Sequence, residues 1–208
     1  ILTPEMGPLI EQRLTPIARR ENFGTVSELV SAARTRGDGK LSAAIADALV
    51  QSETRFFRDR AAFERLRTDI LPTLAQRKGA ALRILCAGVS TGQEAYSIAM
   101  LAEDLRQEGL ILAADIVAID VSERLLDKAR AGLYTQFEVQ RGLPIRKLIA
   151  HFEKAGDLWR ISDRLRAGVR FETHNLLTSL APLGRFDVIL CCNVLSAFDP
   201  MTRVITVE

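Results

Sequence analysis

The spacing of apolar residues changes along this chain, and each change predicts a different element. Over residues 4–50 apolar side chains, mostly alanine and leucine, recur at the three-to-four-residue spacing of helices that bury one face. Gly24 and the Gly-Asp-Gly run at 37–39 interrupt this pattern. The sequence therefore predicts three short helices that form an N-terminal helical domain over residues 1–51.

Residues 81–208 alternate short apolar runs with amphipathic stretches. The apolar run at 82–87 leads through a glycine-containing turn into a helical pattern, and similar runs recur at 115–120 and 186–194. Runs of this kind, separated by helices, are typical of buried strands in a parallel sheet. The sequence therefore predicts an α/β fold with a doubly wound, Rossmann-like sheet. Between the two domains, residues 52–80 are expected to form a linker segment and a helix.

The regular alternation of strand and helix is interrupted between residues 132 and 170. Short runs of alternating apolar and polar residues at 158–161 and 169–173 are typical of antiparallel strands. We therefore expect a small antiparallel β insertion over about 157–173. Trp159, the only tryptophan, is interpreted as a packing anchor.

Composition and charge narrow the classes of function. The 208 residues are 48% hydrophobic, which is enough for a sizeable core. With 28 basic and 26 acidic residues the net charge is +2, which argues against a dedicated nucleic-acid-binding protein. The basic side chains of the N-terminal helices fit two interpretations, solvated helix faces or a docking surface for an acidic partner helix. They are Arg13, Arg19, Arg20, Arg34, Arg36 and Lys40.

Cysteine and histidine usage argues against a disulfide framework and a metal site. Cys86, Cys191 and Cys192 lie in or beside predicted strands, so we expect free thiols in a reducing compartment. His174 has no companions at ligand spacing. No secretory signal leads the chain, and no apolar run approaches the roughly 18–20 residues of a membrane span. We therefore expect a cytoplasmic protein without membrane insertion.

The turn after the first apolar run carries a candidate site. Gly88 and Gly92 bracket this turn, and the first amides of the next helix point at any ligand placed there. A nucleotide-like ligand would fit, although neither Gly-x-Gly-x-x-Gly nor a Walker lysine is present. Glu94 instead adds a carboxylate, which suits a cationic group such as an ammonium or a sulfonium.

Polar residues also follow the other predicted strands. Asp120 ends one strand, and Asn175 and Asn193 follow two later ones. Open α/β sheets bind ligands at the carboxyl ends of their strands. We expect Asp120 to accept hydrogen bonds from ribose hydroxyls and Asn175 to contact the edge of a base. Ser122 is expected to cap the helix that follows Asp120.

The segment 52–59, Ser-Glu-Thr-Arg-Phe-Phe-Arg-Asp, places two aromatic residues between arginines just before a helix. In an extended segment Phe56 and Phe57 point in opposite directions. We expect one of them to anchor the segment and the other to cover a ligand. For Thr54 the sequence leaves two possibilities open, a ligand contact or a plain helix cap.

Taken in order, five motifs resemble those of the CheR family, S-adenosylmethionine-dependent methyltransferases that esterify glutamates on bacterial chemoreceptors. The motifs are Thr-x-Phe-Phe-Arg at 54–58, Ser-Thr-Gly-x-Glu-x-Tyr-Ser at 90–97, Asp120 at a strand end, Asn-Leu-Leu at 175–177 and Phe-Asp-Val-Ile-x-Cys-x-Asn-Val at 186–194. The resemblance covers nearly the whole chain, including the leading helical domain.

The resemblance implies S-adenosylmethionine as cofactor, S-adenosylhomocysteine as product and the cytoplasmic helices of methyl-accepting chemoreceptors as partners. It implies a catalytic role for Arg58, whose fork of donors would orient a carboxylate. It also implies that Glu94 holds the methionyl ammonium and that Asp120 binds the ribose. The implied cofactor-binding residues are Ser52, Thr54, Arg58, Glu94, Asp120, Asn175, Leu176, Cys192 and Asn193. In some members of the family the β insertion grips a receptor tail.

The chain departs from the family's pattern at four places. Cys192 stands where the family usually has arginine, Ser196-Ala197 replace an Ile-Tyr pair, and Gln93 replaces an acidic residue. The chain also ends at Glu208, before the last strands that complete the sheet in this family. These departures leave open a relative that binds the cofactor without catalysis and acts as a binding or signalling module. A dinucleotide-dependent oxidoreductase and a methyltransferase for another substrate are further alternatives.

Overall fold

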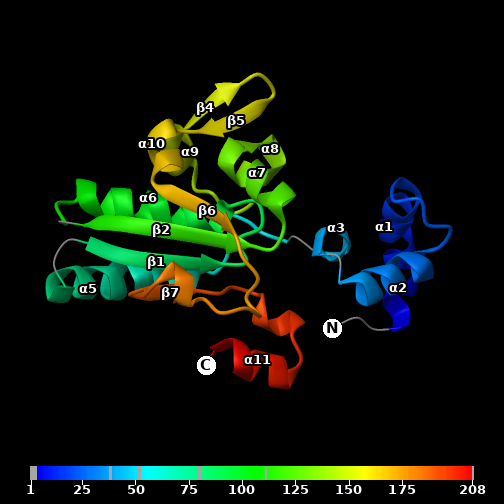
Figure 1. Cartoon of the computed structure of the whole chain (residues 1–208). Helices are drawn as coiled ribbons and strands as arrows, with labels where there is room; N and C mark the ends of the chain where they lie inside the picture. Colours follow the sequence, from blue (N-terminus) through cyan, green and yellow to red (C-terminus); the bar gives the residue numbers. More distant parts are fainter. Residues whose placement is uncertain (1–3, 38, 51–52, 79–80, 111, 208) are drawn as a thin grey trace.

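The computed structural model describes residues 4–37, 39–50, 53–78, 81–110 and 112–207. At its centre lies a parallel sheet of four strands in the order β6-β2-β1-β7 (Figure 1). The strands are β1 (Ala81–Ala87), β2 (Ala113–Asp120), β6 (Val169–Thr173) and β7 (Val188–Leu190). The predicted α/β fold with a Rossmann-like sheet is confirmed.

The two central strands are buried on both faces, because alternate residues enter different apolar clusters. On one face Ile84 and Cys86 pack with side chains of α6 (Gln93–Gln107). On the other face Leu85 and Val117 pack against apolar residues of the loop after β6. Burial on both faces explains why these strands read as continuous apolar runs in the sequence.

The crossovers between parallel strands are made by α6 and by α7 (Glu123–Ala131) with the segment that follows it. Ser122 caps α7, as predicted, because its Oγ accepts a hydrogen bond from the N–H of Leu125 at 3.2 Å. Gly92 precedes α6 with a φ of +87°, and a Cβ there would lie 2.8 Å from Cβ of Ala129. Glycine therefore lets α7 pack closely against the turn.

A second, antiparallel sheet follows α7 in the sequence (Figure 1). Tyr134 of this sheet donates its hydroxyl hydrogen to the carbonyl oxygen of Thr91 at 2.8 Å, which fastens the sheet to the turn after β1. Its strands lie in the order β3 (Leu133–Tyr134), β5 (Leu158–Ile161) and β4 (Phe152–Ala155). The same part of the chain contains the short helices α8 (Gln136–Gln140), α9 (Ile145–His151) and α10 (Asp163–Ala167).

The predicted bounds of the β insertion, about 157–173, are wrong. The run at 169–173 is β6, which pairs in parallel with β2 and places Val169 opposite Ile116. Val169 and Phe171 are buried in the main core whereas Arg170 is exposed. The alternation is therefore that of an edge strand in the central sheet. The antiparallel partners of β5 lie earlier in the chain, in β3 and β4.

The N-terminal residues form a separate group of helices. Their buried side chains, among them Leu14 and Leu29, make an apolar cluster distinct from those of the sheet. Asp47 contacts the start of α7, where it accepts hydrogen bonds from Ser122 and, at 3.0 Å, from Arg124. The elements are η1 (Pro4–Met6), α1 (Gly7–Arg20), α2 (Val26–Arg36) and α3 (Gly39–Leu49).

One continuous helix leads into β1, made of α4 (Arg60–Arg65), a π-helical turn (Leu66–Ile70) and α5 (Leu71–Lys78). Asp59 caps this helix by accepting a hydrogen bond from the N–H of Ala62 at 3.1 Å, so the alternative of Thr54 as its cap is wrong. The remaining elements are η3 (Ala181–Leu183), η4 (Leu195–Ala197) and α11 (Pro200–Val207). In the described part of the chain, no helix combines the length and apolarity needed to cross a bilayer.

Candidate functional site

A cavity of about 540 Å³ opens at the carboxyl ends of the central strands. Gly88 follows β1, Asp120 ends β2 and Cys192 comes shortly after β7, and all three line the cavity. This edge of a parallel sheet is where open α/β folds bind ligands. The cavity therefore lies where the sequence predicts a site.

The predicted site residues that the structure describes come together here from distant parts of the chain. Glu94 belongs to the first turn of α6, Asn175 follows β6, and Arg58 precedes α4. Those that line the cavity are Thr54, Arg58, Glu94, Asp120, Asn175, Leu176, Cys192 and Asn193. Ser52 lies outside the described residues.

The turn after β1 approaches the chain after β7 closely. Gly88 has a φ of +70°, and a Cβ at this position would clash with Cγ2 of Val194. The N–H of Gly88 donates to the carbonyl oxygen of Ile119 at 2.8 Å, which fixes the turn at the end of β2. Ser90 and Asn193, which also line the cavity, have positive φ values of 53° and 61°. Backbone strain of this kind concentrates at functional sites.

Asp120 makes a structural hydrogen bond with each carboxylate oxygen. Oδ2 accepts from the N–H of Ser90 at 2.8 Å, and Oδ1 accepts from the N–H of Ser122 at 3.0 Å. The residue is 7% exposed, so these amides replace water around a buried charge. A carboxylate has about four acceptor positions, so each oxygen can accept one more hydrogen bond. This geometry suits a ligand with two neighbouring hydroxyl groups.

Ser90 contributes an unpaired polar atom to the cavity. Among the described residues, its hydroxyl oxygen is buried without a hydrogen-bond partner. Leaving a buried hydroxyl unpaired is unfavourable, and a polar ligand in the cavity would relieve it. Ser90 belongs to the motif at 90–97, but nothing in the sequence pattern distinguishes it from an ordinary turn residue.

Glu94 adds a second buried carboxylate, at 8% exposure. Burial raises the pKa of Glu94, whereas a hydrogen bond from the Cys192 thiol and the nearby charge of Arg58 act to lower it. A cationic ligand would favour the ionised form, because its charge compensates for the lost water. The cavity therefore suits a ligand that carries both a positive charge and a diol.

Cys192 contacts Glu94 as a neutral donor. Burial, and next the hydrogen bond to Glu94, raise the pKa of Cys192 to about 12. The thiol is therefore protonated at neutral pH and is a poor nucleophile. Cys192 therefore gives the Glu94 carboxylate a hydrogen bond, whereas the arginine expected at this position from the family's pattern would give it a full positive charge.

One of the two adjacent phenylalanines anchors the segment before α4. Phe56 is fully buried and meets the ring of Tyr134 edge-on, with 5.1 Å between centroids. Phe57 is half-buried and lines a neighbouring hollow instead of this cavity. Its N–H donates to Oγ of Ser97 at 3.0 Å, which holds the segment against α6. The expected anchor is thus Phe56, and Phe57 does not cover the cavity.

The N-terminal helices also contribute to the cavity wall, through Met6, Leu49 and Val50. None of the predicted site residues lies in this part of the chain. Apolar residues in a helical pattern carry no signal that separates a ligand-facing position from a core position.

Comparison with known families identifies the domain around the cavity. The family described as CheR methyltransferase, SAM binding domain, matches residues 52–207. This protein belongs to the CheR methyltransferase family. The predicted family and its cofactor, S-adenosylmethionine, are confirmed. The alternative of a dinucleotide-dependent oxidoreductase is excluded.

Two relatives show how far the similarity of this CheR methyltransferase extends. Chemotaxis protein methyltransferase 1 of Vibrio cholerae is 36% identical over 92% of this chain and 70% of its own length. Chemotaxis protein methyltransferase Cher2 of Pseudomonas putida is 32% identical over 94% of this chain and 73% of its own length. Among solved structures, DszA carbon methyltransferase is similar over 86% of this chain and 38% of that chain, at a TM-score of 0.41 and 16% identity.

The residues of the cavity fit S-adenosylmethionine. Glu94 offers a carboxylate to a positively charged group, Asp120 retains acceptors for a diol, and Ser90 has an unused hydroxyl. No three His, Cys, Asp or Glu side chains gather as a metal site within the described ranges.

Proposed function

We propose that this CheR methyltransferase transfers the methyl group of S-adenosylmethionine to glutamate side chains of bacterial chemoreceptors, in the cytoplasm, during chemotaxis adaptation. The observation that carries the proposal is the pairing of two buried carboxylates, Glu94 and Asp120, in one cavity of a CheR domain. The relatives from V. cholerae and P. putida are named chemotaxis protein methyltransferases, which supports a chemoreceptor as the substrate.

In this proposal each polar group of the cavity has one task. Glu94 would hold the ammonium of the methionyl part, and Asp120 would accept hydrogen bonds from the two ribose hydroxyls. Asn175, Leu176 and Asn193 would line the adenosine or methionine part of the pocket. Thr54 and Cys192 would complete the cofactor contacts.

S-adenosylmethionine would supply, when bound, its sulfonium methyl group: a carboxylate oxygen bonds to the methyl carbon as the bond from that carbon to sulfur breaks, which yields a methyl ester and S-adenosylhomocysteine. A glutamate side chain is already ionised at neutral pH, so the protein needs no general base. Its task is to align two opposite charges and to keep water out. Arg58 lines both the cavity and a more polar hollow beside it, where its paired N–H donors would orient a carboxylate. The ester removes a negative charge from the receptor helix, which is a means of tuning its signalling state.

A transfer assay with methyl-tritiated S-adenosylmethionine and a purified chemoreceptor cytoplasmic fragment tests the proposal. We expect label on the fragment that base releases as volatile methanol, because carboxyl methyl esters hydrolyse in base whereas N-methyl groups do not. A fragment whose methyl-accepting glutamates are replaced by alanine is the control and should stay unlabelled. Cofactor binding in calorimetry without any transfer, or label that resists base, would contradict the proposal.

A further inference from the structure

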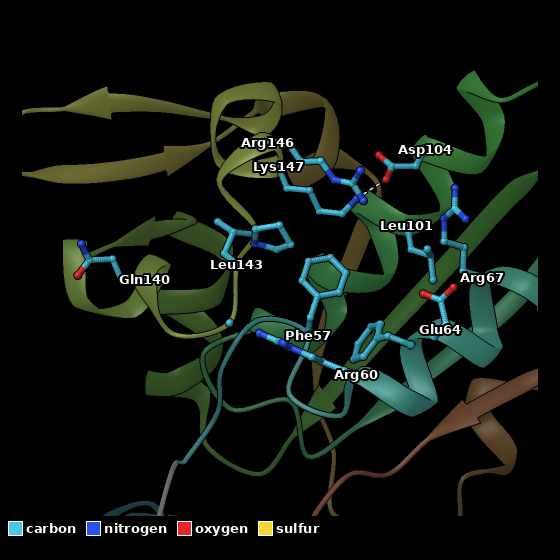
Figure 2. A pocket seen from close by; sticks show the side chains of 13 residues that line it. Phe57, Arg60, Glu64, Arg67, Leu101, Asp104, Gln140, Leu143, Arg146 and Lys147 are labelled. Atoms are coloured by element: carbon cyan, nitrogen blue, oxygen red, sulfur yellow. Dashed lines mark hydrogen bonds and ion pairs between the residues drawn. The ribbon is translucent and has the colours of Figure 1, made fainter.

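A second hollow, of about 460 Å³, lies between the start of α4 and the segment that leads into α9 (Figure 2). In Figure 2 the ring of Phe57 points into it, and Lys147 reaches toward Asp104 across its upper side. We call this hollow the basic groove, defined by Phe57, Arg60, Phe63, Leu143, Arg146 and Lys147.

The basic groove is joined to the cofactor cavity by a third, more polar hollow. This hollow shares Phe57 and Arg60 with the groove, and it shares Arg58 and Asn193 with the cavity. The residue proposed to orient the methyl acceptor therefore stands between the two. A partner bound in the groove lies next to the route by which an acceptor side chain reaches the methyl donor.

The basic groove concentrates positive charge in a chain that is close to neutral overall. Its cations outnumber its acids: Arg60, Arg67, Arg146 and Lys147 face Glu64 and Asp104. Lys147 is buried and paired with Asp104, and Arg67 is paired with Glu108. Arg60 and Arg146 are exposed and have no ion-pair partner among the described residues. These two arginines are available to an external acid.

Neither Arg60 nor Arg146 stands at a position where its charge would stabilise its own helix. Arg60 is the first residue of α4, and Arg146 is the second residue of α9. Positive charge is unfavourable near a helix N-terminus, because the aligned amides already place partial positive charge there. Two arginines at such positions on separate helices, both facing one groove, indicate a role in binding.

Apolar surface lies on the same helix as one of these arginines. Ile145 and Ile149 are 70% and 76% exposed and lie one helical turn apart on α9. A contiguous exposed apolar patch rimmed by charged residues is typical of a contact surface. Because Arg146 follows Ile145 directly, α9 offers apolar surface beside the positive charge of the groove.

We infer that the basic groove and the isoleucines of α9 dock an acidic amphipathic helix of the methyl-accepting partner. Its carboxylates would face Arg60 and Arg146, and its apolar side chains would cover Ile145 and Ile149. The inference rests on the proposed function, because a helix docked here presents a neighbouring glutamate to Arg58. The combination of positive charge and apolar surface favours an acidic amphipathic helix over a nucleic acid. A nucleic acid would match the arginines and leave the isoleucines uncovered.

Steady-state methylation of a chemoreceptor cytoplasmic fragment tests the docking site. We expect the double variant Arg60→Glu/Arg146→Glu to raise KM for the fragment at least tenfold, with kcat and the Kd for S-adenosylmethionine within about twofold of the parent. Both changes place a carboxylate near a helix N-terminus, so the variant is expected to fold. Circular dichroism checks this.

The matched control is Arg65→Glu/Arg77→Glu, which changes the net charge equally. Arg65 lies on the same helix as Arg60, roughly 140° around its axis, and does not line the groove. Arg77 is exposed on α5 and does not line the groove either. We expect the control to leave KM within about twofold of the parent. Equal rises in KM for both double variants, or no rise for either, would overturn the inference.

A binding assay separates failure of the docking site from failure of the proposed function. The probe is a fluorescein-labelled synthetic helix with glutamates on one face and leucines on the other. A scrambled peptide of the same composition is its control. If the parent protein methylates no receptor fragment but binds the probe at least tenfold more tightly than Arg60→Glu/Arg146→Glu does, the docking site stands and the substrate assignment falls. The docking site would be overturned if the parent protein bound the scrambled peptide as tightly as the probe. It would also be overturned if the parent and the double variant bound the probe equally.

Discussion

The cofactor cavity and the basic groove are joined by a hollow that Arg58 lines, yet their charged residues differ in sign and in exposure. The cavity buries the carboxylates of Glu94 and Asp120, at 8% and 7% exposure. The groove leaves Arg60 and Arg146 in solvent. A buried charge is costly until a ligand compensates it, so it selects strongly for one small molecule. An exposed charge costs little and mainly favours encounter with a large partner.

The largest effect is expected from Asp120→Asn, which changes the cavity and leaves the groove intact. The amide loses the charge that strengthens hydrogen bonds to the ribose hydroxyls, and its NH2 group faces a backbone N–H donor. We expect a loss of about 2 kcal/mol, or roughly 30-fold in the Kd for S-adenosylmethionine measured by calorimetry.

Asp115→Asn is the matched control for this change, because Asp115 lies on the same strand and forms an exposed ion pair with Arg83. Its affinity for S-adenosylmethionine should equal that of the parent. Similar losses in both variants would mean that Asp120 acts only through the stability of the sheet.

Arg58→Ala tests the link between the cavity and the groove, because Arg58 lines both the cavity and the hollow that leads to the groove. Loss of its donors should lower kcat/KM for methyl transfer at least tenfold, through weaker cofactor binding or poorer alignment of the acceptor. Calorimetry with the cofactor and kinetics with the receptor fragment would separate the two causes. Unchanged values in both measurements would remove Arg58 from the site.

The smallest effect is expected from Glu94→Gln. This change should weaken cofactor binding and should raise the stability of the cofactor-free protein. Because burial raises the pKa of Glu94, the folded protein holds this proton more tightly than the unfolded chain does. The stability gained by protonation is present at low pH and is lost as the pH rises through the raised pKa. Ionised Glu94 therefore destabilises the cofactor-free protein at neutral pH.

We expect Glu94→Gln to raise Tm of the cofactor-free protein by about 2 °C at pH 7 and to weaken cofactor binding about tenfold. In the parent protein the affinity should fall as the pH drops through the raised pKa, whereas the variant should show no such fall. Scanning calorimetry and titrations between about pH 5 and pH 8 measure both effects. A parent affinity that stays constant over this range would argue against Glu94 as the anion that binds the cofactor.

The cavity residues could be predicted because strand ends follow a local rule. Asp120 ends an apolar run and Glu94 follows a glycine turn, and parallel strands bring such positions to one edge of the sheet. The bounds of the antiparallel sheet could not be predicted, because β3 and β5 are short and strands of two to four residues give little periodicity. Only pairing in space shows that the run after Gly168 belongs to the central sheet.

The basic groove could not be predicted for a different reason. Arg60 and Arg146 are far apart in the sequence, and each reads as an ordinary exposed residue of a helix. What joins them is the packing of α9 over Phe57, with Nζ of Lys147 lying 5.4 Å from the centre of its ring. The contribution of Leu49 to the cofactor cavity was missed in the same way, since apolar residues of a helix look alike until the fold places them.

The described residues of the N-terminal helices supply no ionisable group to the cavity, and yet their position bears on how tightly the protein retains its methyl donor. Leu49 and Val50 form part of the cavity wall, and Nη1 of Arg13 on α1 lies 3.4 Å from each of their carbonyl oxygens. Any molecule that binds this wall favours the arrangement in which the helices are docked, and undocking must weaken its binding to the same extent. Binding of the cofactor and docking of these helices are therefore reciprocally coupled.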